Sequence, residues 1–307
     1  MTPALWIILT GALAASSCAL VGSFLVLRRM AMLGDAISHA VLPGIAIAFL
    51  VSNSRAPLPM LVGASTLGVV TAVLVEWLHR SGRLQQDASI GVTFTWLFAI
   101  GVILITVFAG QVDLDQECVL YGEIAYVPWD TWTLVSGRSM GPRAVWILGG
   151  ALLFNVAWIS IAYKELKICA FDPELAASLG IPVAFFHYLL MAATSITTVT
   201  AFESVGAILV VAMIVGPAAT AYLLTDRLAH MLLLSVGIGI LSSGLGYLIA
   251  HLLDCSIAGA MSVVIGALFA LALLLSPVHG ILVRRWRLRR LATLPGPLAG
   301  TAQEPSS

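Results

Sequence analysis

The chain carries little charge for its length. Only 10% of its 307 residues are Asp, Glu, Lys or Arg, whereas a soluble domain carries about 25%. Hydrophobic residues make up 60% of the chain, and the mean hydropathy is +1.03. This composition excludes a soluble enzyme of ordinary make-up. It also excludes intrinsic disorder, which requires low hydrophobicity and high net charge. The formal net charge of zero gives no indication of a nucleic-acid partner.

Several motifs of enzymes and metalloproteins are also missing. The chain has four cysteines, Cys18, Cys118, Cys169 and Cys255. They show no CxxC spacing, so they predict neither a zinc knot nor a disulfide framework. A P-loop requires a lysine after a glycine, and the two lysines, Lys164 and Lys167, follow other residues. The chain is therefore a secondary transporter, a channel, an intramembrane enzyme, or the membrane part of a pump whose ATPase is a separate chain.

Long apolar runs recur along the sequence. They cover residues 5–27, 36–51, 58–78, 89–109, 144–163, 183–201, 204–223, 228–251 and 256–277. About 20 helical residues cross a hydrocarbon core, and a span outside a barrel must be helical because its backbone polar groups pair internally. The sequence thus predicts an all-α, polytopic transmembrane helix bundle with eight or nine spans; we count nine. The first run lacks a basic leader, so we expect it to be retained as a span.

The distribution of Lys and Arg predicts the orientation. With the N-terminus outside and nine crossings, twelve of the fifteen basic residues face the cytoplasm, as the positive-inside rule requires. The C-terminus then lies in the cytoplasm. We expect one transmembrane domain over residues 1–292 and a disordered cytoplasmic tail over 293–307.

Two connections between runs are longer than a turn. The outer connection, 110–143, is acidic and contains Asp113, Asp115, Glu117, Glu123 and Asp130. The inner connection contains a capped helix at about 172–181, which is either a docking element or a compact link. Its boundaries are indicated by an N-cap at Asp172, a first-turn proline at Pro173 and a terminating glycine at Gly180.

Asp35 and His39 are the sharpest candidate for chemistry inside the bilayer. They are spaced i, i+4 and therefore share one face of a helix. Ionisable groups within a membrane are functional candidates by default, and a carboxylate with an imidazole suits Mn²⁺ or Zn²⁺. The alternative is a structural hydrogen bond between the two side chains. Two ligands are too few for a tight site, which suits an ion that must leave.

Four further acids and histidines are candidates for a pathway or its mouth: Glu203, Glu123, His251 and Asp254. Glu203 lies between two apolar runs. We favour a solvated loop acid there, with a pathway residue as the alternative. For His251 and Asp254, at the outer end of a run, we favour an interfacial location over a lining of the mouth. For His187, at the start of a run, we expect a structural hydrogen bond.

Four motifs, in order along the chain, resemble those of the metal-ion ABC importer permeases (the ABC-3 family). They are LRRMAMLGDAISHAVLPG at 27–44, DASIGV at 87–92, FDPELAASLGIP at 171–182, and VGAILVVAM at 205–213 followed by GPAATA at 216–221. The resemblance extends over roughly residues 5–277. The outer segment 117–128 resembles the manganese/zinc branch.

The resemblance implies a multi-pass permease of the bacterial inner (plasma) membrane that imports Mn²⁺ or Zn²⁺, or sometimes Fe²⁺, by alternating access. It implies no permanently bound cofactor and no enzymatic activity in this chain, because ATP is used by a partner subunit. The implied partners are a cytoplasmic ABC ATPase, an extracytoplasmic metal-binding protein, membrane lipid and a second permease, identical or paralogous. No nucleic acid is implied.

The resemblance also assigns roles to individual residues. It places the transported metal at Asp35 and His39. It assigns coupling to the ATPase to the inner helix, through Asp172, Glu174, Ala177 and Gly180. ABC importers often have Glu-Ala-Ala followed by Gly in that region, and Glu174-Leu175-Ala176-Ala177 is a loosened form of it.

Three rival interpretations remain at this point. A siderophore or cobalamin permease would not need the Asp35/His39 pair. An intramembrane metalloenzyme usually has a His-Glu-x-x-His helix, and no His-Glu dipeptide occurs here. A purely structural membrane subunit would have no intramembrane polar residue that matters for uptake.

Overall fold

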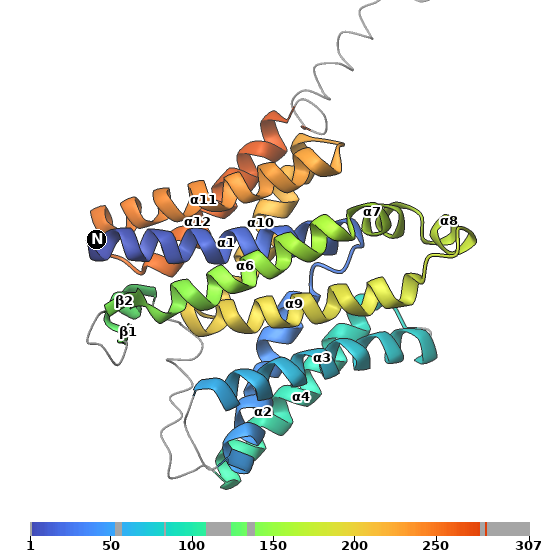
Figure 1. The fold of residues 1–307 in the computed structure, drawn as a ribbon, viewed down its shortest axis with the longest axis horizontal. Helices are drawn as coiled ribbons and strands as arrows, with labels where there is room; N and C mark the ends of the chain where they lie inside the picture. Colours follow the sequence, from blue (N-terminus) through green and yellow to red (C-terminus); the bar gives the residue numbers. More distant parts are fainter. Residues whose placement is uncertain are drawn as a thin grey trace, which may run out of the picture.

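The computed structural model describes residues 2–52, 57–82, 84–108, 124–133, 139–276 and 280, which are almost entirely helical (Figure 1). The long helices are α1 (Pro3–Leu27), α2 (Leu33–Ser52), α3 (Pro57–Gly82), α4 (Gln86–Phe108), α6 (Arg143–Ile161), α9 (Val183–Val205), α10 (Ala207–Leu224), α11 (Leu228–Leu253) and α12 (Ile257–Leu275). Within the described residues, these 9 helices are long and apolar enough to cross a membrane by length and composition. The predicted helix bundle is confirmed, with the larger of the two expected numbers of spans.

Short elements lie at the two ends of the bundle. The 3-10 helix η1 (Ile124–Trp129) is followed by the antiparallel strands β1 (Thr131–Thr133) and β2 (Ser139–Pro142), in which Thr131 pairs with Pro142. At the opposite end lie α7 (Tyr163–Phe171) and α8 (Pro173–Ser178), seen at the right of Figure 1. We call these the β end and the α8 end. The predicted tail, 293–307, lies outside the described residues.

Helix α1 is the centre of the bundle. It contacts α6, α9, α10 and α11, and 61% of its most apolar window is buried, the largest share among the spans. Helices α2, α3 and α4 pack together as a second group, which α9 joins to α1 through its contacts with α3 and α1. Figure 1 shows this order, with α9 between α1 and the α2–α4 group. The segment after α1 therefore leads directly from the central helix into the second group.

Close approach of backbones explains several glycines in the spans. A Cβ atom built on Gly22 of α1 would lie 1.9 Å from the carbonyl oxygen of Ile214 in α10. One built on Gly44 of α2 would lie 2.8 Å from the carbonyl oxygen of Gly63 in α3. Lipid tails are as apolar as leucine, so helices in a membrane associate by tight packing rather than by the hydrophobic effect. These glycines permit that packing.

The boundary between α9 and α10 differs from the sequence-based expectation. The apolar runs are separated at Phe202 and Glu203, but α9 continues through both residues to Val205. The chain turns at Gly206, which has φ 82° and ψ 163°. A positive φ is readily adopted only by glycine. The boundary between α9 and α10 therefore depends on backbone conformation, which a hydropathy pattern does not detect.

A buried polar cluster joins three spans around Asn155 of α6. Its side-chain amide nitrogen donates to Ser17 Oγ in α1 at 2.9 Å and to Thr197 Oγ1 in α9 at 2.7 Å. Its carbonyl oxygen accepts from Trp158 Nε1 at 3.1 Å. Asn155 is fully buried, and every polar atom of its side chain is thereby paired, as a buried amide requires.

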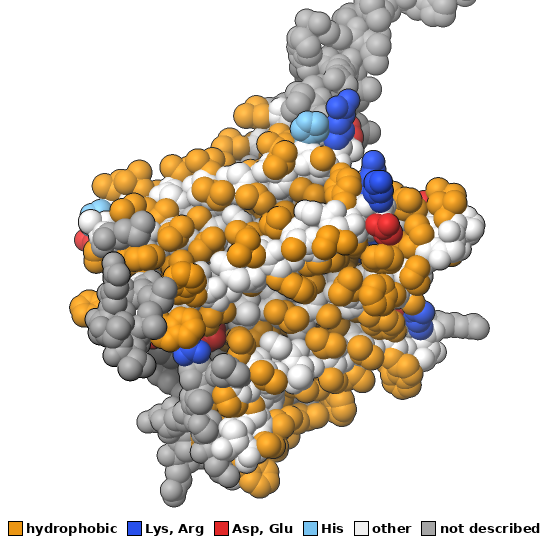
Figure 2. All heavy atoms as spheres, viewed as in Figure 1, with side chains coloured by type: hydrophobic (Ala, Val, Ile, Leu, Met, Phe, Trp, Pro, Cys, Tyr) orange, Lys and Arg blue, Asp and Glu red, His pale blue; other side chains and the backbone are white. Residues whose placement is uncertain are grey.

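The outer surface of the bundle suits a lipid environment. In Figure 2, hydrophobic side chains cover the flank of the bundle, whereas the coloured charges gather toward its two ends. Large exposed apolar residues such as Leu233, Ile161 and Val263 are 70% exposed or more. Contiguous apolar surface of this kind marks contact with a membrane or a partner rather than with water.

We predict that Gly22→Ala destabilises the bundle, because the added methyl group must push α1 away from the α10 backbone. Overpacking of this kind costs about 1–3 kcal/mol. Gly149→Ala in α6 is the matched control, since a Cβ built there meets nothing within 4 Å. Unfolding of the purified permease in increasing dodecyl sulfate measures both. Equal stability of the two variants would contradict the close approach of α1 and α10.

Candidate functional site

Asp35 and His39 lie on the one face of the first half of α2 that this chain leaves open. From Leu33 to Val41, every residue except these two is buried. The side chains of His39 and Asp35 are 34% and 31% exposed, and His39 Nε2 lies 3.6 Å from Asp35 Oδ1. That separation is too long for a direct hydrogen bond. The predicted shared face is confirmed, and both donor atoms are available to a third group.

Two phenylalanines of α4 orient the imidazole. The His39 ring stacks on Phe94 with ring centroids 5.4 Å apart, and it meets Phe98 edge-on at 5.8 Å. Phe94 and Phe98 are spaced i, i+4, so they present one face of α4 to α2. Neither phenylalanine is expected from the sequence, because an aromatic pair in an apolar run has no distinguishing signal.

The pair does not form part of a larger ligand cluster in the described residues. No group of three or more His, Cys, Asp or Glu side chains is found there. A carboxylate and an imidazole can replace two water molecules around a divalent cation, which leaves most of the coordination sphere to water or to another chain. This arrangement favours brief contact with an ion over tight storage.

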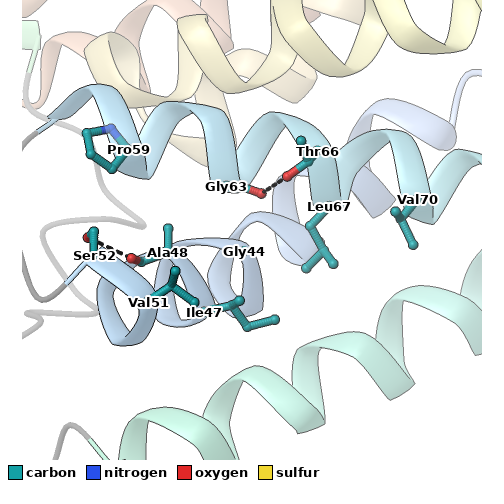
Figure 3. A pocket seen from close by; sticks show the side chains of 10 residues that line it. All are labelled: Gly44, Ile47, Ala48, Val51, Ser52, Pro59, Gly63, Thr66, Leu67 and Val70. Carbon is teal, nitrogen blue, oxygen red and sulfur yellow. Dashed lines mark hydrogen bonds between the residues drawn. The ribbon is translucent and has the colours of Figure 1, made fainter.

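A groove between α2 and α3 lies farther along α2, toward the β end (Figure 3). Its volume is about 340 Å³, and its walls are mostly apolar residues such as Ile47, Val51 and Val70. The Thr66 hydroxyl at its edge donates to the Val62 and Gly63 carbonyl oxygens of its own helix at 2.9 Å. The described residues that line the groove include no charged side chain.

Glu203 lies in the last turn of α9 rather than in a loop. It is exposed and borders a small cavity of about 160 Å³ at the β end, together with Asp130 and Arg143. The expectation that Glu203 sits in the turn between two spans is therefore wrong in position, because Gly206 makes that turn. Glu203 thus shares this cavity with one basic and one acidic residue, and it is distant in sequence from Asp35 and His39.

The two other mouth candidates that the structure describes, His251 and Asp254, lie at the end of α11 and not beside Asp35 and His39. The His251 ring stacks on Tyr247 of the same helix, with centroids 6.2 Å apart. Asp254 is the C-cap of α11 in a left-handed conformation, with φ 47°, and both residues are exposed. Glu123 lies outside the described residues. That His251, Asp254 or Glu123 contacts an ion remains a prediction.

The capped helix of the inner connection is present. The Asp172 carboxylate accepts a hydrogen bond from the Leu175 amide at 2.9 Å, and Pro173 occupies the first turn of α8. At the other end, Gly180 adopts φ 79°, and the Ile181 amide donates to the Ala176 carbonyl at 3.0 Å. Glu174 and Ala177 lie on the exposed surface of this helix.

Helix α7 precedes this cap and was not predicted as a helix. Three large apolar side chains here are exposed: Phe171 at the end of α7, Leu175 of α8 and its C-cap Leu179 are 57%, 49% and 62% exposed, and we call them the apolar stripe. Cys169 of α7 is buried, and its burial raises the pKa of the thiol, whereas the apolar stripe is exposed and open to a partner.

A second polar cluster, absent from the sequence-based expectations, lies at the α8 end. Glu76 of α3 is 6% exposed, and its Oε2 lies 3.0 Å from His187 Nε2 of α9. Its other oxygen accepts from the Arg80 guanidinium. His187 Nδ1 lies 3.1 Å from Arg28 Nη1. The expected structural hydrogen bond of His187 is confirmed. Glu76 could have been found from the sequence as a single acidic residue within an apolar run.

Arginine can only donate, so in this contact Nδ1 of His187 is the acceptor, and Nε2 lies where it can donate to Glu76. Arg28 has no anionic partner within hydrogen-bonding distance among the described residues. Burial lowers the pKa of its guanidinium, although nearby Cys169 and Glu76 partly oppose this effect.

Comparison with known proteins gives a consistent result. The family model described as the ABC 3 transport family matches residues 2–276. A "Manganese transport system membrane protein MntD" from Bacillus subtilis is 54% identical over 92% of this chain and 95% of that protein. A "Zinc transport system membrane protein TroD" from Treponema pallidum is 41% identical over 93% of this chain and 77% of that protein.

Solved structures are similar as well. One, described as PsaBC from Streptococcus pneumoniae in complex with Fab, has a TM-score of 0.76 and 30% identity, with 94% of this chain and 96% of that chain covered. A second, an inward-facing conformation of a putative metal-chelate type ABC transporter, has a TM-score of 0.65 but only 16% identity, with 88% and 85% of the two chains covered. The second therefore supports the fold alone.

We predict that Asp172→Ala loosens α8, because one amide of its first turn loses its acceptor. Loss of an N-cap costs about 1 kcal/mol, which corresponds to roughly fivefold faster amide exchange. Hydrogen exchange over residues 173–178 measures the change. Asp172→Asn keeps the acceptor and should exchange almost like the wild type; fast exchange in both variants would show that the cap bond is not what holds the helix.

Proposed function

The chain belongs to the ABC 3 transport family, and from this premise we propose that Asp35 and His39 contact a divalent transition-metal ion on its path through the permease. The coarser conclusion is established. The chain is the permease of a metal ABC importer and a multi-pass protein of the bacterial plasma membrane. As a transport subunit it works with an ABC ATPase and a solute-binding partner.

The observation that carries the proposal is the open face of α2. A charged residue in a membrane span normally has a partner or lines an aqueous path. The chain buries every neighbour of Asp35 and His39 from Leu33 to Val41 yet leaves these two side chains about one third exposed. Their donor atoms are separated by more than a hydrogen bond, so neither satisfies the other.

A pair of ligands also fits the task of a transporter. A site that must release its ion should hold it weakly, and two ligands with several remaining waters do so. A second permease with its α2 face opposite would bring four donors to one ion. We therefore extend the proposal to a permease dimer, formed with an identical or a paralogous chain, with the ion at the interface.

The transported ion is Mn²⁺ or Zn²⁺ in this proposal. Relatives named for manganese and for zinc both align over most of the chain. Carboxylate with imidazole accepts either ion, and Fe²⁺ as well. Among these, manganese is favoured by the higher identity to the relative named for it. A larger metal chelate is not favoured, because only the 16% identical structure points to one.

The partners are assigned to the two ends of the bundle. We propose that the ATPase binds α8, through the apolar stripe of Phe171, Leu175 and Leu179 and through Glu174. Exposed apolar area at an end that also carries charge suits a protein interface. The metal-binding protein is assigned to the β end, where the outer connection is acidic. This matches the prediction that the α8 end faces the cytoplasm.

The direct test is metal uptake into liposomes. The permease is reconstituted with its ATPase and binding protein, and uptake of ⁵⁴Mn and ⁶⁵Zn is measured for the wild type, Asp35→Ala and His39→Ala. We expect at least about tenfold slower uptake for each variant, since loss of a charged or ligating contact of about 1.4 kcal/mol or more has that effect. The isotope that the wild type prefers identifies the cargo.

Matched controls separate this effect from general damage. Asp226→Ala and His230→Ala remove an exposed acid and an exposed histidine near the start of α11, away from α2. Both should transport at the wild-type rate. Unchanged uptake in Asp35→Ala and His39→Ala, with the complex intact, would refute the pathway assignment.

The docking assignment has its own test. Leu175→Glu places a charge in the middle of the apolar stripe, so we expect weaker binding of the ATPase subunit to the detergent-solubilised permease, by about tenfold. Ser178→Glu introduces the same charge at an exposed position of α8 outside the stripe and should bind nearly normally. Equal binding of the two variants would show that the stripe does not contact the ATPase.

A further inference from the structure

The α8 end contains a basic cavity for which the transport mechanism above has no use. Its volume is about 370 Å³, within the range of small-molecule sites. Three arginines border it: Arg28 and Arg29, which follow α1, and Arg80 of α3. Among the described residues, Glu76 is the one acid on its wall, and His187 and Arg80 already engage it.

Arg28 is the unexplained group in this cavity. Its Nε and Nη2 atoms are buried, and neither has a hydrogen-bond partner in the part of the chain that the structure describes. The remaining nitrogen, Nη1, contacts His187 Nδ1. A buried N–H of a charged group costs free energy when it is left unpaired, so native proteins pair it. Two such donors on one guanidinium form the fork that binds carboxylate or phosphate oxygens.

Two helix N-termini add to the positive potential. Helix α4 begins at Gln86 and α9 begins at Val183, and both residues line the cavity. The first N–H groups of a helix have no acceptor within it, and its N-terminus carries about half a positive charge. Both helices exceed twenty residues. The cavity therefore combines a guanidinium with two unpaired nitrogens, two further arginines and two helix N-termini.

The surroundings indicate the source of the anion. Trp77 and Tyr188 directly follow Glu76 and His187, and they are 63% and 40% exposed. Amphipathic aromatic rings at the end of a span mark the depth of the lipid headgroups. Basic pockets between spans at that depth bind anionic headgroups. A soluble phosphate would share the chemistry but would not need this position.

From these contacts we infer that the cavity binds the phosphate group of an anionic phospholipid, which pairs with Nε and Nη2 of Arg28 and with Arg29. The lipid thereby joins the connection between α1 and α2 to the starts of α4 and α9. This site is separate from Asp35 and His39, and it requires no metal.

The test uses the permease–ATPase complex in nanodiscs of phosphatidylcholine, alone or mixed with phosphatidylglycerol, without added metal. Native mass spectrometry measures retained phosphatidylglycerol, and thermal unfolding measures its stabilising effect. We expect the wild type to retain the anionic lipid and to melt at a higher temperature in the mixture. Arg28→Gln and Arg29→Gln should weaken retention by about tenfold, because each loses a charge-assisted contact.

Arg227→Gln is the matched control, since Arg227 is an exposed arginine outside this cavity, before α11. It should retain the lipid like the wild type. Arg29 is exposed and in a left-handed conformation, so Arg29→Gln decides the matter if Arg28→Gln fails to assemble. Equal retention by all three variants would refute the site, because it would reflect general charge attraction.

Two further results would overturn the lipid assignment. Inorganic phosphate could stabilise the wild type in phosphatidylcholine alone, as strongly as phosphatidylglycerol does, with loss of the effect in Arg29→Gln. The ligand would then be a soluble anion. Alternatively, the lipid effect could vanish in the complex and appear only after the ATPase is removed. In that case a side chain of the partner would occupy the cavity. Neither result would bear on metal uptake through Asp35 and His39.

Discussion

Hydrocarbon offers a peptide group no hydrogen-bond partner, and most features of this molecule follow from that constraint. Each span must pair its own backbone, so the apolar runs become helices. Association of those helices cannot rely on the hydrophobic effect, so it depends on backbone approach at small residues such as Gly22 and Gly44. Polar side chains must also be paired, which explains why Asn155 uses every polar atom of its side chain to join α1, α6 and α9.

The same constraint gives meaning to the polar groups that are not paired. Asp35 and His39 are left partly exposed on an otherwise buried stretch of α2. Arg28 keeps two buried donors without acceptors. Elsewhere in the described residues of the bundle, ionisable groups lie at helix ends or form pairs such as Glu76 with His187. The incompletely paired charged groups in the described residues are thus the ones to which we assign a partner from outside the chain.

Hydropathy predicted the spans well because it reports directly on the transfer of side chains to lipid. It could not place the end of α9, since the turn at Gly206 depends on backbone conformation. The cap at Asp172 was predicted because an Asp-Pro pair has a local mechanism. Helix α7 was missed because its sequence is only weakly apolar and has no cap. The position of Glu203 was misjudged for the same reason as the end of α9.

The candidate site residues also differ in whether local sequence alone could predict them. Asp35 and His39 could be found from sequence because their shared face is a property of one helix. Phe94, Phe98, Glu76 and the unpaired Arg28 could not, because each acquires its role only when distant helices meet. The connection after α1 shows the consequence: Arg28 and Asp35 are seven positions apart in sequence, and Pro173 of α8 lines the cavity that Arg28 borders. The proposed metal contacts, the basic cavity and the helix assigned to the ATPase are therefore connected by one short segment. A displacement of α8 thus has a direct physical route to the face of α2 that carries Asp35 and His39.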